Sequence, residues 1–134
     1  MTSAPPPPDD PRLAEFPRPL TGRERDTVVE VLDRGDIPEA EAYRAQLDHA
    51  VAVAPCSCPC ASIDIEVDVS AVPPAPGRGG GPLPGNWTHL VPGDPGQETY
   101  FLLVWQNDGY LSGLEIAWLN EPPVELPPPQ VWES

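Results

Sequence analysis

Hydrophobic and polar positions along the chain predict helices in its first half and strands in its second. The strongest strand pattern is Tyr100 to Trp105, a run of aromatic and aliphatic residues. Asp108-Gly109 follows and is a strong hairpin signal, because glycine accepts a positive φ. Tyr110 to Leu119 then predicts the returning strand. Because this hairpin carries most of the aromatic mass, we expect the core to form against it.

A second clear strand signal is the segment from Ser62 to Val69. Its aliphatic residues alternate strictly with Asp64, Glu66 and Asp68. Such alternation predicts one buried face and one solvated face, and here the solvated face is a row of carboxylates.

Other parts of the second half have weaker patterns. Val51 to Val53 predicts a short strand, and Trp87 to Val91 predicts a short strand or a lid segment. The Pro/Gly-rich stretch between 71 and 85 predicts a flexible connector, since it lacks the lysine and the helix of a phosphate-binding loop. Regular structure should end near Glu121, because the prolines after it cannot donate to a strand ladder.

Two amphipathic helices are predicted before the strands. The first covers Thr21 to Arg34, with Thr21 and Glu24 in capping-box spacing and Gly35 as its stop. The second should be capped by Asp36 and run to about Asp48. Its outer side is mostly acidic, which excludes a DNA-reading helix pair.

These elements predict a single α+β domain between residues 20 and 126. Two helices would pack on one face of an antiparallel sheet of about four strands. Residues 1–19 predict a disordered Pro-rich arm, and residues 127–134 an extended C-terminal tail. Leu126 and Trp132 are apolar residues that we expect to dock on the body of the domain.

The net charge of the chain limits the classes of partner that it can bind. Its 134 residues include 21 acidic and 7 basic side chains, for a formal net charge of −14. This balance excludes a nucleic-acid binder and docking on anionic membranes, and favours either a cationic partner or simple solubility. The N-terminus lacks the pattern of a secretory signal, and no apolar run approaches the ~20 residues of a membrane span. We therefore expect a cytoplasmic protein.

All three cysteines lie close together, at Cys56, Cys58 and Cys60. Thiolates suit zinc, and His49 or His89 would supply a fourth ligand. The spacing departs from the common C-x2-C, and on a strand these sulfurs would stand too far apart for one ion. We therefore favour small, half-buried thiols without metal, with a zinc site as the alternative.

The remaining candidates for chemistry are the carboxylates Asp64, Glu66, Asp68 and Glu115. Paired carboxylates hold Mg²⁺ or Ca²⁺ in other proteins, but no calcium-loop motif follows Asp68. The alternative is a solvated strand face. Gly-x-Ser-x-Gly is absent and no Ser/His/Asp set has supporting context, so we expect no enzyme.

The chain resembles a family of small actinobacterial or actinophage α+β proteins. The resemblance rests on the order of a helix pair, C-S-C-P-C at 56–60, S-I-D-I-E-V at 62–67 and D-G-Y-L-S-G-L-E-I-A-W at 108–118. It covers residues 20 to 126. This family has no known function, so the resemblance implies a fold and a source but no site residues.

The sequence thus favours a non-enzymatic, acidic interaction protein, similar to toxin-immunity or inhibitor proteins. In this interpretation Asp64, Glu66, Asp68 and Glu115 face a basic protein partner and raise its association rate. The alternative is a zinc-stabilised structural or regulatory domain that uses the cysteine cluster.

Overall fold

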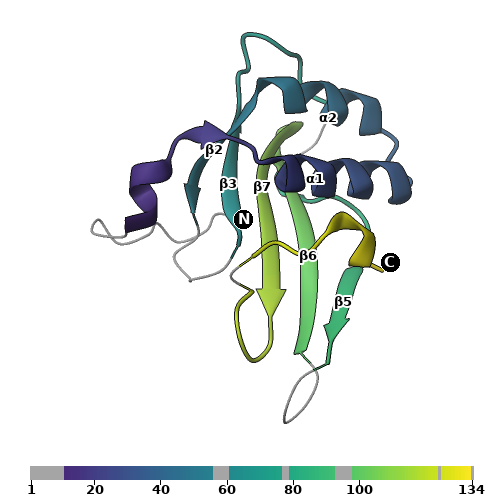
Figure 1. Ribbon diagram of the computed structural model, residues 1–134. Coiled ribbons are helices and arrows are strands. Elements are labelled where there is room, and N and C mark those ends of the chain that lie inside the picture. The colour runs from purple at the N-terminus through teal and green to yellow at the C-terminus, as the bar shows by residue number, and fades with distance from the viewer. Residues whose placement is uncertain (1–10, 56–60, 77–78, 93–97, 124, 134) are drawn as a thin grey trace.

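The computed structural model combines two short helices with a seven-stranded antiparallel sheet, and it describes residues 11–55, 61–76, 79–92, 98–123 and 125–133 (Figure 1). The α-helices are α1 (Gly22–Arg34) and α2 (Ala40–Gln46). The strands are β1 (Arg18–Pro19), β2 (Ala50–Pro55), β3 (Ile63–Val67), β4 (Gly81–Pro82), β5 (Trp87–Val91), β6 (Glu98–Asn107) and β7 (Tyr110–Trp118). Short 3₁₀ helices are η1 (Pro11–Glu15), η2 (Leu47–His49) and η3 (Pro129–Val131).

Helix α1 begins and ends as its sequence predicts. The Thr21 hydroxyl accepts from the Glu24 amide at 3.1 Å, and the Glu24 carboxylate accepts from the Thr21 amide at 2.9 Å. These two bonds confirm the predicted capping box. At the other end, the Gly35 amide donates to the Val31 carbonyl at 2.8 Å. Both ends of the helix therefore have partners for otherwise orphaned backbone groups.

Helix α2 starts later than predicted. Asp36 does not cap it, because this residue has a positive φ of 51° and lies in the turn after α1. Aspartate tolerates this left-handed conformation better than most residues. Tyr43 and Leu47 are buried. Gln46 is buried too, although its side chain is polar.

The prediction of a sheet of about four strands is wrong, because the sheet has seven in the order β1-β2-β3-β7-β6-β4, with β5 also paired to β6. Strands β1 and β4 have two residues each, too few to show an alternating pattern. β1 lies within the predicted disordered arm, and β4 within the predicted connector. Proline is tolerated in both because an edge position does not need its missing N–H.

The predicted hairpin joins β6 to β7 through a two-residue turn at Asp108 and Gly109. Both residues have positive φ, 51° and 86°, as a tight hairpin turn requires. A side chain at Gly109 would also collide with the Ala75 carbonyl, whose chain runs against the turn. The Ala75 amide donates to the Gly109 carbonyl at 2.8 Å. Glycine is therefore needed here for both conformation and space.

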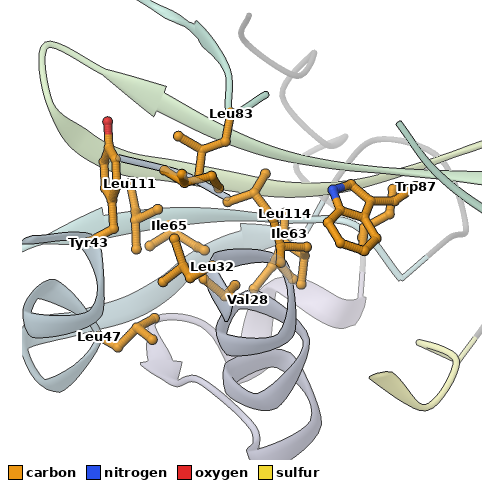
Figure 2. Close-up of a cluster of buried hydrophobic side chains, with 14 of the residues drawn as sticks. Val28, Leu32, Tyr43, Leu47, Ile63, Ile65, Leu83, Trp87, Leu111 and Leu114 are labelled. Carbon is orange, nitrogen blue, oxygen red and sulfur yellow. The ribbon is translucent and has the colours of Figure 1, made fainter. Parts of the chain in front are cut away.

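One face of the sheet is buried under the helices. Figure 2 shows Val28 and Leu32 of α1 and Leu47 of η2 on one side of the sheet, against Ile63 and Leu114. Most inward residues of the central strands are buried, among them Ile63, Ile65, Val67, Leu102, Val104, Leu114 and Ile116. Burial of each such side chain contributes about 1.5–3 kcal/mol, so this layer is the main source of stability.

The C-terminal segment belongs to the domain rather than forming a free tail. Leu126 is buried and Trp132 is 1% exposed, so both dock as predicted. Arg34 donates to the Trp132 carbonyl at 2.7 Å, and Glu133 pairs with Thr88 of β5 through backbone bonds in both directions. Residues 125–133 therefore pack on the domain through Leu126, Trp132 and the pairing with β5.

Candidate functional site

The strand register identifies the residues on the opposite face of the sheet. Asp64 lies opposite Gly113, and Gly113 lies opposite Trp105 on the next strand. Their side chains alternate with the buried ones and point away from α1 and α2. We call this surface the outer face, and it comprises Val51, Asp64, Glu66, Leu90, Phe101, Leu103, Trp105, Glu115 and Ala117.

Outer-face side chains are half-buried or exposed, whereas their inward neighbours are buried. Phe101 is 38% exposed and Leu90 is 52% exposed. In the described part of the chain, α1 and α2 both pack on the inner residues, so neither helix covers this face. A contiguous set of exposed apolar side chains is a typical feature of protein-binding surfaces.

The centre of the outer face is an aromatic side chain with a fixed orientation. The Trp105 indole N–H donates to the Glu115 carboxylate at 2.8 Å. Gly113 lies beside it, and an ideal Cβ there would be 3.8 Å from the Trp105 Cβ and Cδ1. Trp105 is therefore preorganised for contact with a partner.

Three of the four predicted carboxylates lie together on this face. Asp64 and Glu66 come from β3, and Glu115 from β7. Asp68 lies beyond the end of β3, at the corner of the face, where it is exposed. Its carboxylate accepts from the Ser70 hydroxyl at 2.6 Å and from the Ser70 amide at 3.0 Å. These bonds, the hydroxyl first, lower the pKa of Asp68.

Charge is unevenly distributed between the two sides of the sheet. The charged residues of the outer face are all acidic. Arginines that form salt bridges within the described residues lie on the helices or next to them, in the pairs Arg18–Glu24, Arg25–Asp48, Arg34–Glu30 and Arg44–Asp33. The outer face consequently presents a negative potential around an aromatic centre.

The sequence predicts that the core forms against this hairpin, but it does not separate the two faces of the strand. Phe101, Leu103 and Trp105 stand in a continuous apolar run, in which hydrophobicity alone does not distinguish inward from outward residues. The signal that would have separated them is the hairpin register, in which alternate residues share a face. With both helices on one side, every second residue of the run faces outward.

A hollow of about 410 Å³ lies next to the first turn of α1, away from the outer face. It is bordered by η1, the first turn of α1 and Leu126. Arg18 and Glu24 line it and form a bidentate pair, with both bonds at 2.8 Å. The hydrogen bond to Glu24 raises the pKa of Arg18. Arg18 and Glu24 therefore compensate each other's charge at this hollow.

The predicted cysteine cluster, Cys56, Cys58 and Cys60, lies outside the described residues. His49 is exposed at the start of β2, and His89 packs against Trp132 with ring centroids 5.9 Å apart. Across the ranges that the structure describes, no group of three or more His, Cys, Asp or Glu side chains forms a metal site. The zinc alternative and the expectation of no enzyme stay predictions.

Comparison of the chain with families of known proteins, with curated proteins and with solved structures finds no match. The resemblance to small actinobacterial proteins therefore stays a prediction. Among the described residues, no helix is both long and apolar enough to cross a membrane.

Proposed function

We propose that the protein is a non-enzymatic, acidic interaction protein that binds a basic protein through its outer face. The observation that carries this proposal is an open sheet face whose charged residues are all acidic around Trp105 and Phe101. Aromatic anchors surrounded by complementary charge are the usual composition of energetically important protein interfaces.

The concrete form that we propose is an immunity-like or inhibitor-like protein, which covers a basic surface of another protein and blocks its action. Immunity and inhibitor proteins are often small, acidic and α+β, and the support here is by analogy. A second copy of the chain fits poorly as the partner, since each copy carries a formal charge of −14 and the two outer faces would repel.

Selection of peptides from a random displayed library against the full-length protein tests the proposal. Enriched peptides should carry net positive charge together with apolar residues, and their binding should weaken as salt is added. At about 0.1 M salt, Glu66→Lys should slow association about threefold to tenfold, because steering acts on the encounter rate. Phe101→Ser should instead speed dissociation, since it removes an apolar contact.

The matched control is Glu41→Lys, which makes the same change in net charge at an exposed position of α2. It should change association by less than about twofold, because salt screens charges beyond about 10 Å. Equal effects of Glu66→Lys and Glu41→Lys would show that binding follows net charge alone. Neutral or acidic enriched peptides would contradict the proposal as well.

A further inference from the structure

A groove at one corner of the outer face has a mixed apolar and acidic lining. Its volume is about 450 Å³. It lies where the chain enters β2 and leaves β3, two segments joined by a bond of 2.9 Å from the Asp68 amide to the His49 carbonyl. The lining residues are His49, Val51, Glu66, Val67, Asp68 and Val69.

Two valines give the groove an exposed apolar surface. Val51 is 38% exposed and Val69 is 64% exposed. Glu66 and Asp68 are both exposed beside them, and neither has a salt-bridge partner within the part of the chain that the structure describes. The groove thus combines aliphatic contact with two carboxylates, and His49 is the remaining polar side chain of its lining.

Building on the proposed function, we propose that this groove binds a lysine or arginine side chain of the basic partner. The aliphatic stem would lie on Val51 and Val69, and the cationic head would reach the carboxylates of Glu66 and Asp68. Long basic side chains routinely bury their stems on apolar surface while their charged heads stay near water.

Charge complementarity favours this occupant over the alternatives. A second copy of the chain, with a formal charge of −14, would be repelled. A purely apolar segment would remove Glu66 and Asp68 from water without compensation, which is unfavourable. A metal ion would gain no ligand from the two valines. Ser70 also holds the Asp68 carboxylate in place, so little order is lost when a cation binds.

Titration of the ¹⁵N-labelled full-length protein with small probes tests the inference. The probes are Nα-acetyl-lysine amide and Nα-acetyl-arginine amide, and the neutral controls are the norleucine and citrulline analogues. The amide signals of Val51, Glu66 and Val69 should shift with both cations, with affinities about fivefold above those of the neutral analogues. If only one cation binds, the result identifies which side chain the groove selects.

Two variants test the two halves of the groove. Glu66→Gln should weaken binding of the cations about threefold, and Val69→Ser should weaken binding of cations and neutral analogues alike. Glu41→Gln on α2 is the matched control and should change nothing. Equal binding of cationic and neutral probes, or shifts spread evenly over the protein, would overturn the inference.

The outcomes also separate this inference from the proposed function. If library peptides bind near Trp105 but the cationic probes do not shift the groove signals, the groove inference is wrong and the proposed function stands. If the groove binds the cations while peptides ignore Phe101 and Trp105, the groove is a cation site and the wider interface is wrong.

Discussion

Replacement of Gln46 tests how the helical layer fixes the hairpin that carries the outer face. Gln46 is fully buried on α2. Its amide nitrogen donates to the Gly109 carbonyl at 2.7 Å, and its amide oxygen accepts from the Leu111 amide at 2.9 Å. A single side chain thus binds the last turn residue and the second residue of β7.

The expected loss of stability follows from the hydrogen bonds that Gly109 and Leu111 lose when Gln46 is replaced. In Gln46→Ala the buried Leu111 N–H loses this acceptor, at a cost of about 1–3 kcal/mol, whereas the Gly109 carbonyl keeps the Ala75 amide as a donor. The small cavity adds to this loss, so we expect about 3 kcal/mol in total. That corresponds to a fall in Tm of about 10 °C for a domain of this size.

Urea unfolding followed by tryptophan fluorescence measures the effect, with Glu41→Ala as an exposed control on the same helix. Gln46→Leu keeps most of the volume and should still lose about 2 kcal/mol. Gln46→Glu should lose stability as the pH rises above about 4, because burial raises the pKa of a carboxyl and the folded state then binds more protons. If Gln46→Leu unfolds within about 0.5 kcal/mol of the unaltered protein, the hydrogen-bond argument is wrong.

Four further predictions concern the rest of the chain. Trp132→Ala should cost about 3–5 kcal/mol in urea unfolding, and a loss below about 1 kcal/mol would show that the C-terminal segment is dispensable. Arg18→Ala should cost about 1–3 kcal/mol, since it leaves the buried Glu24 carboxylate without its bidentate partner, and Arg18→Lys should restore part of the loss. Desolvation opposes ionisation of Glu98, but the amides of residues 119–121 outweigh it and lower the pKa of Glu98. Its contribution to stability is therefore present at neutral pH and lost in acid, so Glu98→Gln should differ most from the unaltered protein at neutral pH and converge with it below about pH 4. Elemental analysis after metal-free purification should find less than about 0.1 zinc per chain, and stoichiometric zinc that is lost with each Cys→Ser change would support the alternative instead.

Short sequence motifs correctly predicted those parts of the fold whose geometry depends only on residues adjacent in the sequence. The capping box at Thr21 and the turn at Asp108-Gly109 each need only a few adjacent residues, and the structure confirms both. The alternation is confirmed from Ile63 to Val67, because period 2 fixes which residues share a face. The predicted strand is too long at its end, since β3 stops at Val67 and Val69 is 64% exposed.

Tertiary contacts decided what the sequence did not predict. The strands β1 and β4 form because β2 and β6 offer free edges for pairing. Each has only two residues, which is too short for an alternating pattern to be recognised in the sequence. Gln46 is buried because the hairpin turn needs its amide, a contact across 63 positions of sequence to Gly109. The outer position of Trp105 likewise depends on both helices packing on the same face of the sheet.

The same arrangement explains why the candidate site and the fold are separate. The inner residues and Gln46 hold the sheet to the helices, while Phe101 and Trp105 contribute little to the buried layer. Substitutions on the outer face should therefore change binding more than stability, which makes Phe101→Ser and Glu66→Lys suitable test variants.

Site-specific photo-crosslinking in the cells that make the protein tests the central claim most directly. A photoreactive phenylalanine analogue replaces Phe101 on the outer face or, as the control, Glu41 on α2. The account predicts a crosslink from position 101, absent from position 41, to a protein with an isoelectric point above about 9, and loss of that crosslink when Glu66→Lys is added. An acidic crosslinked protein, or equal crosslinking from both positions, would contradict it.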